Sequence, residues 1–340
     1  MTSTPLKTSY RESKFPREAP TILLTGLLAV GLLIFAPNSR DWGNALAVGQ
    51  SASFIGLLAC GEALVIISGG LDLSIGAILA MAACVTAIAL SGGASPAVGI
   101  TAGIATGGAA GLINGGLITD RLPIPIPDNF RSALRKRLKS SPRPPILTTL
   151  ATLLILRYGT SIFTHSKSYN AMPESFYNLG QGLTPIIIFL AVVAALIFVT
   201  TRMKFGRWVF AIGGGEQAAT LSGVPTDRVK QVCYLFAGLC AGLMGVVSAA
   251  FNNHAQWDIG KDAALDSIAA CVVGGVRITG GEGSILGVAF GSLLIALLQN
   301  ALVLTGRPKG EYGLFTGGVI LAAAIFEMWR IRRADLNGKT

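Results

Sequence analysis

The stretch GGLDLSIGA at residues 69–77 decides how this chain folds, because it interrupts a long apolar sequence with three glycines, a carboxylate and a serine. Residues 50–68 before it and 75–90 after it are almost free of charge. A helix needs about 20 apolar residues to cross a bilayer. Backbone that leaves a helix at membrane depth must be buried in protein or line a cavity. The flanking runs therefore predict membrane-spanning helices with a break between them.

Four residues of this stretch predict how the break is built. Gly69 and Gly70 can end a helix, because glycine adopts backbone conformations that other residues avoid. Asp72 or Ser74 can cap the next helix by accepting its free backbone N–H groups. A structural cap is our first interpretation of Asp72. The alternative is a direct contact with a transported substrate, since ionisable side chains inside membranes often mark pathways.

Composition extends the membrane interpretation to the whole chain. Of its 340 residues 51% are hydrophobic and only 13% are charged, whereas soluble domains carry about 25% charge. The fold class we expect is all-α: a polytopic transmembrane bundle of about ten helices, some of them broken or re-entrant, especially at 263–275. The ten apolar segments are 21–36, 46–68, 74–90, 96–119, 145–164, 184–201, 229–250, 263–275, 284–305 and 311–329.

Basic residues orient these segments. Ten spans place both termini on one side, and cytoplasmic loops carry an excess of Lys and Arg. Of the 27 Lys and Arg residues, 21 fall on the proposed inner side and five on the outer side, while Arg157 lies inside a span. We therefore expect a membrane protein with both termini cytoplasmic. The net charge of +10 then reflects topology, and nucleic acid is not an expected partner.

The expected organisation is one membrane domain with polar extensions. Residues 1–20 form a cytoplasmic tail, 21–329 the transmembrane domain and 330–340 a second cytoplasmic tail. Within the domain, 120–144 is a basic cytoplasmic insert that is either a solvated loop or a short helix on membrane lipid. The cytoplasmic loop at 202–230 is the other long polar segment.

Further polar groups lie inside the apolar segments. Glu62 and Arg157 either pair with each other or face a polar cavity, and the sequence does not choose. We expect Asn114, Gln299 and Asn300 to hydrogen-bond between helices. The run GGAAGLINGG at 107–116 spaces small residues three or four apart, which predicts close helix packing or a glycine-lined path.

The sequence lacks several motifs that are typical of enzymes. The glycine-rich stretch 274–287 resembles a phosphate loop, but no G-x-x-x-x-G-K-[ST] occurs in the chain. The two histidines and five cysteines form no catalytic triad or metal-ligand pattern. We expect no enzyme activity, no metal site and no cofactor in this chain. Its energy source would be an ion gradient or a separate ATPase.

The loop at 202–230 helps to decide between an ion gradient and a separate ATPase as the energy source. Glu216–Leu221 are expected to form a short helix between the glycines at 213–215 and Gly223. Small residues on such a helix (Ala218, Ala219 and Ser222) suit a helix that docks in the groove of a partner protein. A plain connector between two spans is the alternative.

Three blocks of the sequence are similar to a known protein family. They are GGLDLSIGA at 69–77, FGRWVFAIGGGEQAATLSGV at 205–224 and ALDSIAACVVGGVRITGGEGSILG at 264–287. Together they resemble the permease subunits of ribose-type ABC sugar importers over most of residues 45–330. The resemblance implies about ten helices, a second permease subunit, a cytoplasmic ATP-binding subunit that binds the ATP, and a periplasmic sugar-binding protein. It also implies ATPase coupling by Glu216, Ala218, Ala219, Leu221, Ser222 and Gly223.

The chain departs from that family in three places. Glu62 stands where a neutral residue is expected, Ala264 stands where an acidic residue usually precedes Asp266 by two positions, and 124–143 looks like an insertion. The function we expect is import of a monosaccharide by alternating access. The alternatives are a branched-chain amino-acid ABC permease and an ion-coupled carrier with Glu62 or Asp72 as the ion site.

Overall fold

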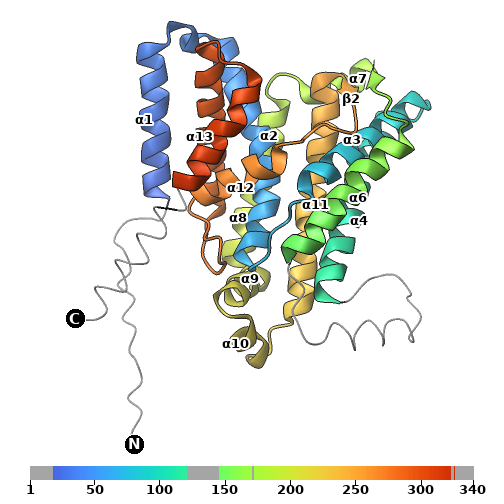
Figure 1. Cartoon of the computed structure of the whole chain (residues 1–340), viewed down its shortest axis with the longest axis vertical. Coiled ribbons are helices and arrows are strands. Elements are labelled where there is room, and N and C mark those ends of the chain that lie inside the picture. The colour runs from blue at the N-terminus through green and yellow to red at the C-terminus, as the bar shows by residue number, and fades with distance from the viewer. Residues whose placement is uncertain (1–17, 121–144, 171, 323–324, 326–340) are drawn as a thin grey trace, which may run out of the picture.

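The computed structural model describes residues 18–120, 145–170, 172–322 and 325. The described part is a bundle of helices running up and down, with one pair of two-residue strands (Figure 1). The predicted all-α fold class is therefore confirmed. Most of the tail at 1–20, the basic insert at 120–144 except Asp120, and the tail at 330–340 lie outside the described residues.

The helices agree with the predicted apolar segments to within a few residues. Asp41 caps α2 by accepting a 2.8 Å hydrogen bond from Gly43 N, and Pro96 and Pro145 open α4 and α6, as proline favours first-turn positions. The elements over the described residues are α1 (Ala19–Phe35), η1 (Pro37–Arg40), α2 (Trp42–Ile67), α3 (Ile75–Ser91), α4 (Pro96–Thr119), α6 (Pro145–Phe163), β1 (Tyr169–Asn170), α7 (Glu174–Tyr177), η2 (Asn178–Gly180), α8 (Thr184–Arg202), α9 (Lys204–Gly214), α10 (Glu216–Leu221), α11 (Thr226–Asn252), β2 (His254–Ala255), α12 (Ala263–Val273), α13 (Ile285–Leu304), η3 (Lys309–Glu311) and a last helix at Tyr312–Ala322.

Six of these helices are long and apolar enough to cross a membrane. They are α2, α4, α6, α8, α11 and α13, while α1, α3, α12 and the last helix are shorter apolar helices. The 11 residues of α12 extend for only about 16 Å, about half of a hydrocarbon core of roughly 30 Å. The sequence prediction of a broken or re-entrant segment at 263–275 is thus confirmed.

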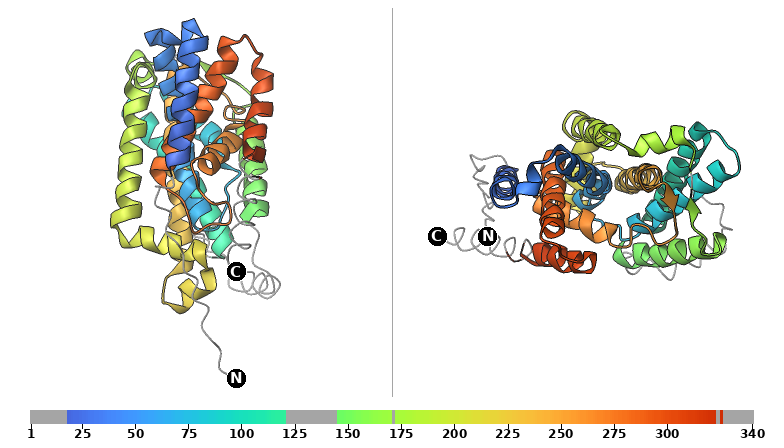
Figure 2. Two further views of the ribbon diagram at one scale, coloured as in Figure 1. Left: turned by 90° about the vertical axis from the view of Figure 1, so that its left-hand side faces the viewer. Right: turned by 90° about the horizontal axis from the view of Figure 1, so that it is seen from above.

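Two helices form the centre of the bundle. α2 contributes an unbroken run of buried residues from Ile55 to Ile67, and α11 packs against α2, α3 and α4. Seen from above, α1, α6 and α8 lie at the periphery (Figure 2). Their large apolar side chains, such as Leu27, Ile155 and Ile187, remain exposed. Such an apolar rim matches lipid hydrocarbon as its surroundings.

Glycines bring α4 and α11 into close contact. Gly103, Gly107, Gly111 and Gly115 lie on one face of α4, and a Cβ atom at Gly115 would lie 2.8 Å from Gln231 Cα on α11. A Cβ atom at Gly111 would overlap the carbonyl oxygen of Tyr234. The run at 107–116 therefore packs against a helix, as one of its two interpretations predicts.

Chain connections gather at the two ends of the bundle. α10 lies at the same end as the start of α1, the end of α4 and the start of α6 (Figure 1). The opposite end carries η1, α7 and the antiparallel pair in which Tyr169 faces Ala255. Of the segments predicted on the inner side, the loop at 202–230 and the described residues that flank 121–144 thus lie at one end of the molecule.

Replacing Gly111 by alanine tests the α4–α11 contact. The added methyl group must push α4 away from the Tyr234 carbonyl, so Gly111→Ala should lower the stability of the purified protein by about 1–3 kcal/mol. Gly159→Ala is the matched control, because nothing lies within 4 Å of a Cβ atom at that helical position. Thermal unfolding in detergent measures both. Equal melting temperatures for the two variants would contradict this packing.

Candidate functional site: the helix break at residues 68–74

The backbone leaves the helix at the predicted position. Gly69 N and Gly70 N still donate to the carbonyls of Ile66 and Val65, at 2.8 and 2.9 Å. Gly69 then adopts a φ of +82°, a left-handed conformation that strongly favours glycine. α3 begins only at Ile75.

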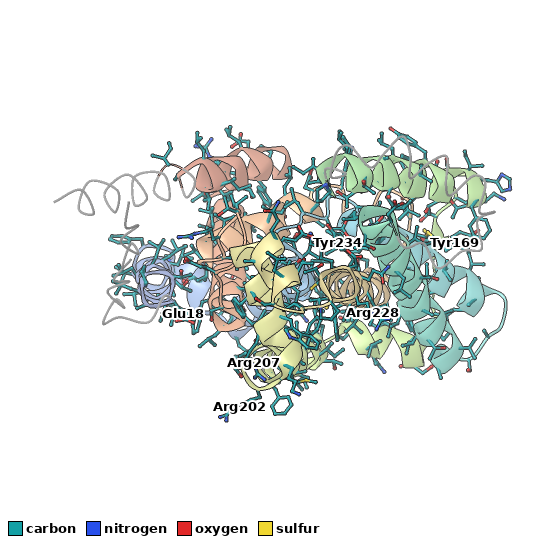
Figure 3. The ribbon with its side chains drawn as sticks, turned by 90° about the horizontal axis from the view of Figure 1, so that it is seen from below. Glu18, Tyr169, Arg202, Arg207, Arg228 and Tyr234 are labelled. Atoms are coloured by element: carbon teal, nitrogen blue, oxygen red, sulfur yellow. The ribbon has the colours of Figure 1, made fainter. Side chains whose placement is uncertain are left out.

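Side chains from two other helices hold the carbonyl of Leu71 in this segment. The hydroxyl of Tyr234 of α11 donates to it at 3.4 Å, and Thr149 Oγ1 of α6, which also lies 3.0 Å from the Pro145 carbonyl, is within donor distance of it at 3.2 Å. Seen from the end that carries α10, Tyr234 lies within the bundle, whereas Arg202 and Arg207 lie at its outer edge (Figure 3). Backbone that has left the helix is thus satisfied by protein groups, as a membrane interior requires.

Asp72 is the centre of the hydrogen bonding that follows. Its Oδ1 accepts from Ser74 N at 2.9 Å and from the Ser74 hydroxyl at 2.6 Å. Asn114 Nδ2 of α4 lies 3.3 Å from Asp72 Oδ2 and 2.7 Å from Ser74 Oγ. Asp72 therefore has the bonding of a cap for the turn that leads into α3. Neither side chain accepts a backbone N–H of α3 itself: Ser74 is the residue before α3, its N–H bonds to Asp72, and its hydroxyl also donates to Asp72.

Glu62 completes the group from the facing part of α2. Its Oε1 accepts a hydrogen bond from Asp72 N at 3.0 Å. Glu62, Asp72, Ser74 and Asn114, which we call the break cluster, are all fully buried. Within the described residues neither carboxyl group has an ion pair, and Glu62 Oε2 and Asn114 Oδ1 have no hydrogen-bond partner. Burying such groups is costly unless donors compensate, so the donors around Asp72 stabilise the break.

The predicted docking helix is present at one end of the molecule. α10 starts after Gly215 and is tied to α11 by a 2.7 Å ion pair between Glu216 and Lys230. Leu221 is 90% exposed, while Ala219 is only 5% exposed and packs into the core. Gly223, with a φ of +80°, ends the segment. Ala218 and Ser222 are exposed beside Leu221.

Comparison with known proteins assigns the chain to a protein family. The family model described as the permease component of the branched-chain amino acid transport system matches residues 44–324. The chain belongs to this permease family. The matched range begins within α2 and includes every later element up to the last described helix of the permease, so it contains both the break cluster and α10.

Individual relatives of the permease extend over nearly its whole length. The L-arabinose transport system permease protein AraH of Escherichia coli (strain K12) is 31% identical over 331 residues, 95% of this chain and 94% of AraH. The ribose import permease protein RbsC of Bacillus subtilis (strain 168) is 32% identical over 307 residues, 88% of each chain. The predicted resemblance to ABC sugar permeases is confirmed. No solved structure gives a significant match.

Arg157 and Asn300, two further polar residues of the predicted spans, lie outside the break cluster. Arg157 of α6 approaches the Gly260 carbonyl at 3.5 Å and does not pair with Glu62. Asn300 of α13 exchanges hydrogen bonds of 2.7 and 3.3 Å with Asn44 of α2. Asn114, Gln299 and Asn300 do bond between elements, as predicted; Gln299 donates to Asp266 at 3.3 Å.

Two contributors to the break were missed by the sequence analysis. Tyr234 is a single tyrosine in a run of small and apolar residues, and Thr149 is one of several threonines in α6. A buried tyrosine needs a partner for its hydroxyl, which is a signal that could have singled out Tyr234. Nothing in the sequence distinguishes Thr149 from its neighbours.

The contrast between Asp72→Asn and Asp72→Leu tests the role of the carboxylate. Asparagine keeps an acceptor for Ser74 N, so Asp72→Asn should retain most of the stability and transport. Leucine leaves buried donors unpaired, which costs about 1–3 kcal/mol for each, so Asp72→Leu should reduce the amount of folded protein. Thermal unfolding and uptake measure both effects.

Asp41→Leu is the control for this series. Asp41 also accepts a backbone N–H, but at an exposed helix start, where water can replace the lost acceptor. It should therefore destabilise less than Asp72→Leu. Loss of transport by well-expressed Asp72→Asn would contradict a purely structural role and would favour an ion-coupled carrier.

Proposed function

We propose that this chain is the membrane subunit of an ATP-driven importer for a monosaccharide. The supporting observation is that AraH and RbsC, whose names specify L-arabinose and ribose, match it over 88% or more of its length. The proposed partners are a cytoplasmic ATP-binding subunit, a second permease subunit and a periplasmic sugar-binding protein. The chain itself would hold no cofactor, because ATP would be bound by the partner subunit.

Two structural features fit roles in this function. The break is a non-helical segment in the core that receives hydrogen bonds from α4, α6 and α11, and a broken helix suits a pathway wall whose geometry changes during alternating access. α10 presents an apolar tip at one end of the molecule, where Leu221 is exposed. A partner ATPase would cover this tip.

The branched-chain amino-acid permease is the second candidate, because the family model carries that description. A sugar and an aliphatic amino acid require different recognition, since a sugar presents many hydroxyl groups and an amino acid presents a charged carboxylate and ammonium. The relatives' sugar names favour the first candidate. An ion-coupled carrier is the third candidate, supported by the buried carboxyl groups of Glu62 and Asp72.

ATP-dependent uptake tests the function. The complex is purified through a tag on the permease and reconstituted into proteoliposomes with its binding protein. We expect uptake of L-arabinose or ribose that requires ATP, and no uptake of leucine. Leucine uptake would favour the second candidate, and sugar uptake driven by an ion gradient without ATP would favour the third.

Leu221→Asp is the variant to include, because a charge at the exposed tip of α10 should weaken ATPase binding and lower uptake at least tenfold. Leu183→Asp is its matched control: Leu183 is also exposed, 50%, and precedes α8 at the opposite end of the bundle. Normal ATPase recovery and uptake by Leu221→Asp would contradict docking through α10.

We also propose an inner-membrane location with both termini and α10 cytoplasmic, supported by the asymmetry of basic residues. Ser168 and Ser222 are both exposed, near β1 and at the end of α10. In a background without the five native cysteines, an impermeant thiol reagent added outside should label Ser168→Cys and not Ser222→Cys. The reverse labelling pattern would show that α10 lies outside, contrary to the proposed topology.

A further inference from the structure

Three glycine segments that are far apart in the sequence meet at the end of α2. Gly281 N donates a 2.9 Å hydrogen bond to the carbonyl of Ile67, the last residue of α2. A Cβ atom at Gly280 would lie 3.0 Å from Gly69 Cα and 3.2 Å from Gly213 Cα. We call Ile67, Gly69, Gly213, Gly280 and Gly281 the glycine junction.

Gly213 is the most tightly enclosed member of the junction. A Cβ atom there would overlap the carbonyl oxygen of Ile67 and the backbone nitrogen of Gly281. Both neighbours are backbone atoms, so no side-chain rotation could make room. Gly214, the next residue, has nothing within 4 Å of its Cβ position. The backbone of Gly214 also lies near Gly281, where a Cβ atom would be 2.7 Å from Gly214 N, but only at Gly213 is there no space for a Cβ atom of its own.

The junction lies between α10 and the break cluster. Gly213 precedes Glu216, the first residue of α10, by three positions, and Gly69 precedes Asp72 by three positions. α10 is in addition tied to α11 through the ion pair of Glu216 and Lys230. A displacement of the α9–α10 segment must therefore press on the end of α2 and on the backbone at Gly69.

Backbone-to-backbone contact makes this link stiff. Packed interiors have low compressibility and transmit strain, and contacts between side chains can relax by changing rotamers, whereas contacts between glycine backbones cannot. Small shifts at one site become larger rearrangements when the receiving element has two arrangements. The receiving element here is the non-helical segment at 68–74, which hydrogen bonds from α6 and α11 reach, so a shift of its backbone requires those bonds to rearrange.

We infer that Gly213 is a positioning residue that transmits movement of the docking helix α10 to the helix break at Asp72. This inference rests on the proposed function, since it requires an ATPase on α10. It concerns what happens after docking: the ATPase moves α9 and α10, Gly213 moves against Ile67 and Gly281, and the break cluster changes its arrangement.

Gly213→Ala and Gly214→Ala provide the test in the reconstituted complex. Gly213→Ala should retain ATPase recovery within about twofold of wild type and should continue to hydrolyse ATP, while sugar uptake per ATP hydrolysed falls at least tenfold. Gly214→Ala should resemble wild type in all three measurements. A wild-type ratio of uptake to hydrolysis in Gly213→Ala would overturn the inference.

Hydrogen–deuterium exchange supplies a measurement that needs no substitution. In the wild-type complex, adding ATP should change the exchange of backbone amides at 68–74, and unchanged exchange there during active uptake would overturn the inference. If Gly213→Ala folds, this response should be lost while its ATPase remains bound. Failure of the wild-type permease to bind any ATPase would instead reject the proposed function.

Discussion

The structure depends on the hydrogen bonds made to the backbone and to the Asp72 carboxylate at the break between α2 and α3. A non-helical segment inside a membrane cannot obtain hydrogen bonds from water, so the chain supplies them from Ser74, Asn114, Thr149 and Tyr234. These donors come from α4, α6 and α11 and from the residue before α3. The break therefore fixes the mutual positions of the central helices, and the peripheral helices pack around that arrangement.

Glycine packing between α4 and α11 makes these hydrogen bonds possible. Asn114 lies between Gly111 and Gly115 on α4, and the backbone of Tyr234 on α11 faces Gly111. Larger residues at these glycines would separate the two helices. Asn114 would then no longer reach Asp72, and the Tyr234 hydroxyl would no longer reach Leu71. The glycines and the polar residues inside the spans therefore act together. Because the glycines let the helices approach closely, buried donors reach buried acceptors.

Much of this arrangement could be predicted from local sequence, because helix ends, apolar runs and glycine spacing are local signals. The ten apolar helices, the half-length α12, the break at Gly69 and the interhelical role of Asn114 were all predicted correctly. The predictions that failed or stayed open concerned partners. Ser74 bonds to Asp72 instead of capping α3, Glu62 and Arg157 lie with different neighbours, and Ala219 faces the core. Each partner is set by three-dimensional packing between distant segments, which spacing along the chain does not report.

The position of the donors in the sequence has a consequence for how the protein is made. Asn114 follows Asp72 by 42 residues and Tyr234 follows Leu71 by 163. At a synthesis rate of about 5–20 residues per second, Asn114 emerges roughly 2–8 s after Asp72, and Tyr234 roughly 8–33 s after Leu71. During that interval the nascent segment between α2 and α3 carries the Asp72 carboxylate and the Leu71 carbonyl without their final partners. The insertion machinery, or water within it, must shelter this segment until the later helices arrive.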